Sequence, residues 1–193
     1  MRIEPLGPDS YRRIPWKNGR GALVVIDGEG AGGWERGGVA WHFGRTAIVE
    51  EGPFSDYTGY ERLQVVIKGA GLVLVAADGE IDLRRPMRPQ RYDGGRSVRT
   101  RLERGPVEVV NLIADRARFA IDLAVPAPGG TCWLRPGRHV VYAPAGSARV
   151  RIAGQAHALD EDHALRIQAE APAALEVETG AVLVGSILPR AAG

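Results

Sequence analysis

A lysine in an arginine-rich chain marks the segment Trp16-Lys17-Asn18-Gly19. Lys17 is one of only two lysines among 25 basic residues. A lysine ammonium is a compact donor whose pKa shifts readily, whereas an arginine guanidinium is a planar fork, so the two are not interchangeable. Lys17 is therefore a candidate for ligand binding or acid–base chemistry. The alternative is a plain turn, because Asn-Gly beside an apolar run is typical of a β-hairpin.

A second candidate is His42, which lies in a predicted strand over residues 39–49. Neither face of that strand is purely apolar, as expected of a barrel wall that borders a polar interior. An imidazole that titrates near neutral pH could donate to a carboxylate or act as a general acid or base. The alternative is a hydrogen-bonded wall residue without a functional role.

The third candidate is the amide of Asn111, inside the apolar run of residues 107–113. A polar amide in such a strand must be hydrogen-bonded if it is buried. A neighbouring backbone group could satisfy it. Alternatively, it faces the interior of the barrel together with Val109 and Ile113, and the apolar run by itself leaves both interpretations open.

The sequence predicts no bound metal and no cofactor. No two of the four histidines, His42, His139, His157 and His163, form a His-x-His pair, although several ligands must converge to hold a catalytic metal. Ser55 lacks the Gly-x-Ser-x-Gly pattern of a nucleophile elbow. Cys132 has no partner for an intramolecular disulfide, because it is the only cysteine.

Turns and strands dominate the predicted secondary structure. The 26 glycines and 13 prolines favour many short strands over long helices. Residues 62–83 alternate strand, turn, strand, turn and strand. A second copy follows 75 residues later, with identities at the following pairs: Val65 and Val140, Val66 and Val141, Ala70 and Ala145, Gly71 and Gly146, Val75 and Val150, and Gly79 and Gly154. We therefore expect two similar β units with little helix.

Charge and hydropathy exclude several classes of protein. The net charge of +2 is small, and the arginine-rich segment of residues 84–104 contains a single aromatic residue, so we predict no nucleic-acid binding. Neither a secretory leader nor a membrane-spanning run is apparent. We expect a cytoplasmic protein without a membrane partner. Exposed edge strands make a homodimer possible.

Several short motifs come in an order and spacing that resemble the HutD/Ves family. They are Trp16-Lys17-Asn18-Gly19, Gly52-Pro53-Phe54-Ser55, Gly59-Tyr60-Glu61-Arg62, Gly69-Ala70-Gly71-Leu72, Gly105-Pro106 and Asn111-Leu112. The resemblance covers residues 11–118 well. It implies an all-β bicupin of bacterial origin, with two cupin-like barrels over residues 1–125 and 126–193 and a link to histidine utilisation.

The resemblance also implies a ligand site. It places around a small ligand the residues Trp16, Lys17, Asn18, Tyr60, Arg62 and Asn111. We add His42 to this set because of its residue type and not because of the resemblance. Lys17 and Arg62 would bind carboxylates, while the two asparagines would bind an amide or formamide. A formylglutamate-like or urocanate-like carboxylate suits such a set. For Arg62 the alternative is a surface ion pair with Glu61 or Glu80.

Some positions depart from the family pattern. Arg20, Leu23 and Val24 stand where the family has small or polar residues. In the next strand His42 and Gly44 replace an arginine and a serine, and Gly95 replaces an aspartate. These changes are consistent with a site that is kept while its ligand differs.

Two functions follow as hypotheses. The first is a non-enzymatic, metal-independent bicupin that binds a small carboxylate metabolite and modulates histidine catabolism. The second is a metal-free cupin enzyme, an isomerase or hydrolase of a formylated or imidazole compound, with His42 and Lys17 as acid and base. Turnover, rather than binding, distinguishes them.

Overall fold

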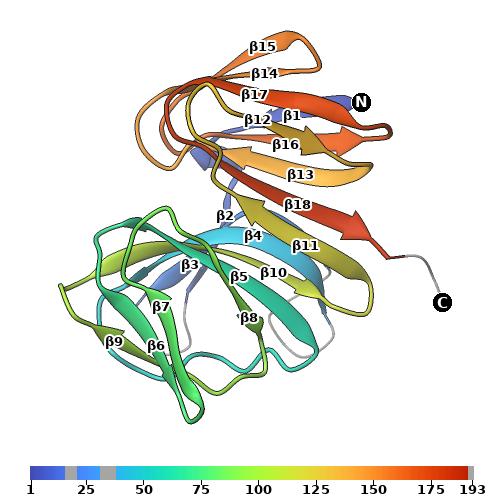
Figure 1. Ribbon diagram of the computed structural model, residues 1–193. Helices are drawn as coiled ribbons and strands as arrows, with labels where there is room; N and C mark the ends of the chain where they lie inside the picture. The colour runs from blue at the N-terminus through green and yellow to red at the C-terminus, as the bar shows by residue number, and fades with distance from the viewer. Residues whose placement is uncertain (16–20, 31–37, 191–193) are drawn as a thin grey trace. The chain divides into compact units, whose positions relative to one another are not determined.

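The fold is almost entirely β, as predicted (Figure 1). The computed structural model describes residues 1–15, 21–30 and 38–190. Within these ranges the 3-10 turn η1 (Pro8–Ser10) is the one helical element, and no helix is long and apolar enough to cross a membrane. The chain divides into unit 1, formed by Met1–Tyr11 and Phe119–Gly193, and unit 2, formed by Arg12–Arg118.

Unit 2 is built from two antiparallel sheets that share a core. Its strands are β2 (Arg12–Pro15), β3 (Ala22–Gly30), β4 (Val39–Ile48), β5 (Tyr60–Lys68), β6 (Leu72–Ala76), β7 (Gly79–Leu83), β8 (Gln90–Asp93), β9 (Arg99–Leu102) and β10 (Val107–Asp115). The larger sheet has the order β2-β3-β4-β10-β5-β8, and the smaller one β7-β6-β9. Val66 and Val109 of the larger sheet lie in one buried cluster with Leu72 and Leu83 of the smaller.

Unit 1 has the same construction. Its strands are β1 (Arg2–Leu6), β11 (Phe119–Ala124), β12 (Thr131–Leu134), β13 (Gly137–Tyr142), β14 (Ala148–Ile152), β15 (Gln155–Leu159), β16 (Ala164–Ala169), β17 (Ala173–Thr179) and β18 (Leu183–Pro189). One sheet has the order β1-β16-β13-β18-β11 and the other β12-β17-β14-β15. Val141, Ile167, Val150 and Leu175 bring the two sheets into one core.

Strand pairing confirms the predicted internal repeat. In unit 2, β5 pairs with β8 and β10, while β6 pairs with β7 and β9. In unit 1, β13 pairs with β16 and β18, while β14 pairs with β15 and β17. The turns that join these strands repeat as well, since Gly71 and Gly146 both adopt positive φ, at 84° and 62°. Glycine has no Cβ and adopts this conformation at little cost.

The division of the chain differs from the predicted boundaries at residues 1–125 and 126–193. Strand β1 pairs with β16, so that Ile3 lies opposite Ile167, and the first residues of the chain belong to unit 1. Strand β11 pairs with β18, placing Ile121 opposite Ile187, so unit 1 resumes at Phe119 rather than at residue 126. These pairings join segments far apart in the sequence, which a local pattern does not reveal.

Candidate functional site

Polar side chains line part of the inner face of the larger sheet of unit 2. Side chains that lie directly opposite one another on paired strands share a face. His42 on β4, Ile113 on β10, Arg62 on β5 and Tyr92 on β8 form one such row. Gly44, Asn111 and Gln64 form the next row. The sheet therefore brings three predicted site residues, His42, Arg62 and Asn111, onto one face.

Arg62 and Asn111 are in direct contact. Arg62 donates two hydrogen bonds to the Asn111 Oδ1, from Nε at 3.0 Å and from Nη2 at 2.8 Å. Both residues are buried, with exposures of 6% and 3%. Asn111 therefore faces the interior, as expected, and its amide oxygen is satisfied by a guanidinium rather than by a neighbouring backbone group.

Three aromatic rings surround the Arg62 guanidinium. Its Cζ lies 4.5 Å from the centroid of Phe54, 5.4 Å from that of Tyr92 and 5.8 Å from that of Tyr57. A cation near an aromatic face is attracted by the ring quadrupole, and the attraction strengthens where water is excluded. Phe54 and Tyr57 lie in the loop between β4 and β5. Backbone hydrogen bonds fix this loop, because the Phe54 N–H donates to the Val98 carbonyl and the Tyr57 N–H donates to the Gly94 carbonyl.

Within the described residues, Arg62 makes no ion pair with a carboxylate. The alternative predicted from the sequence, a surface ion pair of Arg62 with Glu61 or Glu80, is therefore wrong. Glu61 pairs instead with Arg91, and Glu80 pairs with Arg84 and Arg101. A buried charge is costly unless a counter-charge or hydrogen bonds compensate it. The amide oxygen and the aromatic rings provide part of this compensation and leave the net positive charge in place.

Gln64 is a member of the site that the sequence analysis missed. Its side chain is fully buried, and its Oε1 accepts a hydrogen bond of 2.6 Å from the Tyr92 hydroxyl. Its Nε2 has no hydrogen-bond partner in the described part of the chain. A single amide within the apolar run of residues 63–67 was the available signal, by the same argument that identified Asn111. We define the Arg62 cluster as His42, Arg62, Gln64, Tyr92 and Asn111.

His42 is neutral in this environment, which corrects the expectation that it titrates near neutral pH. Burial lowers the pKa of His42 to about 3, and the positive charges of Arg62 and Arg12 act in the same direction. The imidazole is 2% exposed, and its ring centre lies 6.5 Å from that of Tyr57. It is therefore a neutral imidazole and not a cationic donor.

Tyr57 and Tyr92 are neutral as well. Burial raises the pKa of Tyr57 and raises that of Tyr92 to about 12, although Arg62 opposes both shifts. Tyr60, a predicted ligand-binding residue, donates its hydroxyl hydrogen bond to the Val39 carbonyl at 2.8 Å and packs edge-on against Tyr57. Its hydroxyl thus has a structural partner, and its ring supports the aromatic wall.

Three predicted site residues, Trp16, Lys17 and Asn18, lie outside the described residues, as does Arg20. Two glycines that depart from the family pattern have a steric explanation. A Cβ on Gly44 would lie 2.7 Å from the Val24 carbonyl oxygen, and one on Gly95 would lie 2.8 Å from the Thr58 Oγ1. A serine or an aspartate at these positions would therefore require the neighbouring chain to move.

The Arg62 cluster does not fit a divalent metal. Among the described residues, no three His, Cys, Asp or Glu side chains are grouped to hold one. His42 is the only imidazole of its cluster, no carboxylate or thiolate is among the cluster residues, and the amide oxygens of Gln64 and Asn111 already accept hydrogen bonds from Tyr92 and Arg62. The Arg62 charge that lowers the pKa of His42 would also repel a cation. An anion is the electrostatically matched occupant.

Comparison with known proteins shows the family to which the chain belongs. A model of the HutD family matches residues 8–184. The chain belongs to the HutD family. HutD from Pseudomonas fluorescens SBW25 has a similar structure, with a TM-score of 0.80 and 27% identity over 98% of this chain and 100% of that one. A conserved protein of unknown function from Pseudomonas aeruginosa shares the fold, with a TM-score of 0.84 and 22% identity over 99% and 100% of the two chains.

A curated relative agrees with this HutD assignment. It is an uncharacterized 21.2 kDa protein in the hutC 3' region of Pseudomonas putida, 31% identical over 125 residues. The match spans 63% of this chain and 63% of the relative, so less than two thirds of that protein is covered. In this HutD chain, the motif at residues 52–55 supplies Phe54 and the motif at residues 59–62 supplies Arg62, the two sides of the cation–aromatic contact.

Proposed function

We propose that this member of the HutD family binds a small carboxylate metabolite at the Arg62 cluster, without a metal, and thereby modulates histidine catabolism. The observation that supports the proposal is the Arg62 guanidinium, which is buried and has no carboxylate partner among the described residues. A ligand carboxylate would provide the missing counter-charge through charge-assisted hydrogen bonds, which are shorter and stronger than neutral ones.

The amides beside Arg62 suggest what the rest of the ligand resembles. Gln64 offers a buried N–H donor that lacks a partner in the described part of the chain. A formyl or amide carbonyl of the ligand would accept that hydrogen bond. Unpaired buried donors favour ligands that carry the matching acceptor, because a ligand without one leaves the donor unsatisfied. Formylglutamate and urocanate both carry a carboxylate, and formylglutamate also has the carbonyl acceptor.

Binding is measured by isothermal titration with formate, glutamate, formylglutamate and urocanate, with and without a chelator. A ligand that binds only the native state also raises the melting temperature. We expect formylglutamate to bind more tightly than glutamate, since formylation adds a carbonyl acceptor and removes the ammonium charge that Arg62 would repel. We expect Gln64→Leu to reduce this preference by about tenfold, the effect of one buried hydrogen bond.

Arg91→Gln is the matched control, because Arg91 lies opposite Leu63 on the outer face of β8 and pairs with Glu61. It should leave both affinities unchanged. Absence of binding by all four carboxylates would refute the proposal, and loss of binding on chelation would refute its metal independence. Consumption of a bound ligand, followed by NMR, would instead identify the chain as an enzyme.

A further inference from the structure

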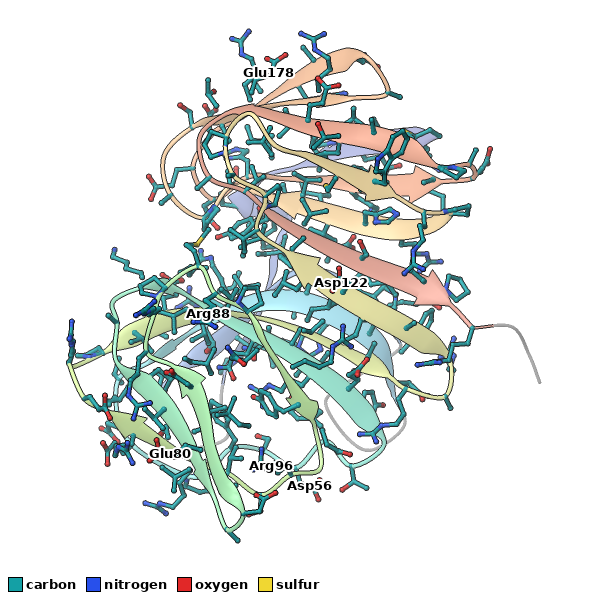
Figure 2. The ribbon with its side chains drawn as sticks, in the orientation of Figure 1. Asp56, Glu80, Arg88, Arg96, Asp122 and Glu178 are labelled. Atoms are coloured by element: carbon teal, nitrogen blue, oxygen red, sulfur yellow. The ribbon has the colours of Figure 1, made fainter. Side chains whose placement is uncertain are left out.

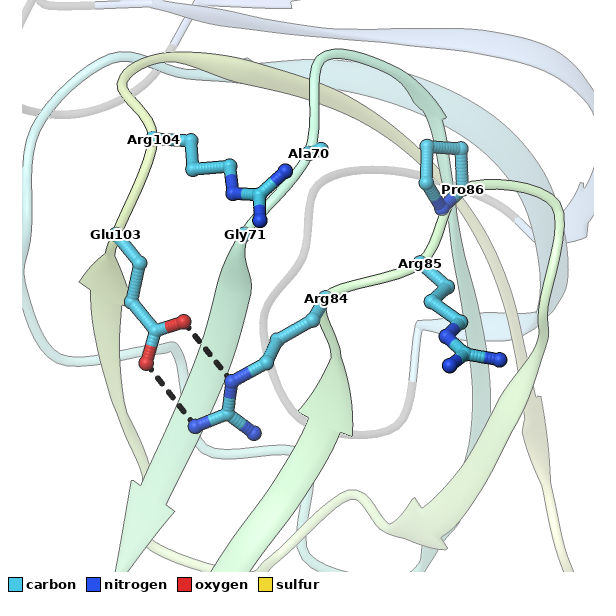
Figure 3. Close-up of a pocket in the computed structure, with 7 residues that line it drawn as sticks. All are labelled: Ala70, Gly71, Arg84, Arg85, Pro86, Glu103 and Arg104. Atoms are coloured by element: carbon cyan, nitrogen blue, oxygen red, sulfur yellow. Dashed lines mark hydrogen bonds and ion pairs between the residues drawn. The ribbon is translucent and has the colours of Figure 1, made fainter.

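A surface hollow in unit 2 gathers three arginines at a place that the Arg62 cluster does not involve. It has a volume of about 350 Å³ and is lined by Ala70, Gly71, Arg84, Arg85, Pro86, Glu103 and Arg104 (Figure 3). These residues come from the turn after β5, the segment after β7 and the segment after β9. The volume falls within the range of small-molecule sites.

One of the three arginines is already neutralised. Arg84 makes a two-pronged contact with Glu103, from Nε to Oε2 at 2.9 Å and from Nη2 to Oε1 at 3.0 Å. It also pairs with Glu80 at 3.0 Å and with Asp82 at 3.4 Å. Glu103 receives a further hydrogen bond from Arg101 at 2.9 Å. The hydrogen bonds from Arg84 and Arg101 lower the pKa of Glu103 to about 2, so this carboxylate stays ionised and bound to arginine.

The other two arginines are not neutralised. Arg85 and Arg104 make no ion pair and no side-chain hydrogen bond with any residue that the structure describes. Arg96, by contrast, pairs with Asp78 and Arg101 with Glu80 and Glu103, whereas Arg88 and Arg99 make no ion pair among the described residues but do not line the hollow. Figure 2 labels Glu80, Arg88 and Arg96 among the charged side chains of unit 2. Two uncompensated guanidinium groups therefore border one hollow.

The backbone brings these arginines to the hollow. A Cβ on Gly71 would lie 3.0 Å from both the backbone N and the Cγ of Arg104, so the Arg104 stem lies against a glycine, as Figure 3 shows. On the other side, Met87 adopts a φ of 59° and its N–H donates to the Val66 carbonyl at 2.9 Å. A left-handed conformation is strained in a non-glycine residue. Here it shapes the turn that presents Arg85.

We propose that this hollow is a second anion site, which binds a phosphate-bearing small molecule at Arg104, with Arg85 turning its exposed side chain toward the same phosphate. A phosphate monoester carries two negative charges and three oxygens, which match two planar guanidinium forks. Ala70 and Pro86 provide the apolar contact for the organic part of the ligand. Nucleic acid is a poorer match, because no aromatic residue is among those lining the hollow and a base would have no stacking partner.

The site is tested by NMR titration of the 15N-labelled protein with inorganic phosphate, pyrophosphate and glucose 6-phosphate, at an ionic strength held constant with NaCl. We expect saturable shifts confined to residues 70–71, 84–86 and 103–104. We expect glucose 6-phosphate to bind more tightly than inorganic phosphate. The double variant Arg85→Gln with Arg104→Gln should weaken binding by about tenfold or more, the effect of losing charge-assisted contacts.

Arg99→Gln is the matched control for each single variant, Arg85→Gln or Arg104→Gln, since it too removes one charge, from an exposed arginine of β9 outside the hollow. It should change the affinity less than twofold, an effect of long-range charge alone. Shifts that do not saturate, or an equal loss in the Arg99→Gln variant, would overturn the proposal. Tighter binding of a single-stranded oligonucleotide than of the phosphate ester would also overturn it. The titration of the unmodified protein stands even if a variant fails to fold, and none of these results depends on the Arg62 cluster.

Discussion

The two units repeat the same strand pairing, yet the polar side chains at equivalent positions differ in how fully they are hydrogen-bonded. Gln64 and Asn111 of unit 2 lie opposite each other, and the residues 75 positions later, His139 and Ser186, also lie opposite each other in unit 1. The His139 Nδ1 is 2.9 Å from the Ser186 Oγ, and its Nε2 is 2.8 Å from the Arg135 carbonyl oxygen. Both ring nitrogens are thus satisfied within unit 1, whereas unit 2 leaves the Gln64 Nε2 without a partner among the described residues.

The largest difference concerns Arg62, whose equivalent 75 residues later is Gly137. A Cβ on Gly137 would lie 2.7 Å from the Leu188 Cδ2 and 2.9 Å from the Ile187 carbonyl oxygen, so an apolar side chain occupies the space beside it. In unit 2 the corresponding position holds a buried guanidinium with aromatic neighbours. We infer that unit 1 is closed by its own side chains, while unit 2 keeps a charge for a ligand to neutralise.

Removing that charge should give the largest effect. Arg62→Met keeps an unbranched side chain but no guanidinium, and we expect carboxylate binding to fall about 100-fold. The free energy of unfolding should fall by no more than about 2 kcal/mol, because relief of the desolvation of a buried charge offsets part of the cost of leaving the Asn111 Oδ1 without a partner. Titration calorimetry and urea unfolding measure the two quantities. A large loss of stability with unchanged binding would show that Arg62 is structural, as its equivalent is.

A larger side chain at Gly137, the equivalent of Arg62, should give the next largest effect, and this effect should be on stability alone. Gly137→Ala places a Cβ in contact with Leu188 and Ile187 at a φ of 150°, which should cost about 2 kcal/mol. Ligand binding at the Arg62 cluster should not change. The control is Gly52→Ala, because a Cβ there meets nothing within 4 Å. Urea unfolding of both variants checks the prediction, and equal stabilities would contradict the close packing of unit 1.

Acid should destabilise the protein through His42, a smaller effect. The pKa of His42 is about 3 when folded, against an ordinary value of 6.5, so the unfolded chain binds the proton more readily between these two values. Stability is therefore complete above pH 6.5 and declines as the pH falls toward 3, by about 1 kcal/mol at pH 5.5. Burial also lowers the pKa of His139, which acts in the same direction.

The variant His42→Gln isolates the contribution of His42 from that of His139. Urea unfolding at pH 8 and pH 5.5 should show a smaller loss of stability in this variant than in the unmodified protein. In the unmodified protein, a bound carboxylate would stabilise protonated His42 and so reduce the pH dependence of the free energy of unfolding. The same pH dependence with and without His42 would show that its pKa is not depressed.

Part of the candidate site could be predicted from local sequence. Asn111 and Gln64 are single amides in apolar strands, and a buried amide must find partners. The burial of Arg62 could not be predicted, because an arginine between Glu61 and Leu63 fits a surface ion pair equally well. Strand register decides between the two: it places Arg62 opposite Ile113 and Tyr92, on the inner face. The expected roles of Trp16, Lys17 and Asn18 stay predictions.

The sequence by itself determined the β fold, the positions of the turns and the repeat, because alternation, turn glycines and a fixed offset are local or periodic signals. The tertiary structure alone decided which strands close each unit, since β1 joins β16 across most of the chain. It also decided that His42 is neutral and that Arg62 has an amide oxygen, not a carboxylate, as its partner. Both outcomes depend on burial and on neighbours supplied by distant strands, and burial sets the cost of a charge.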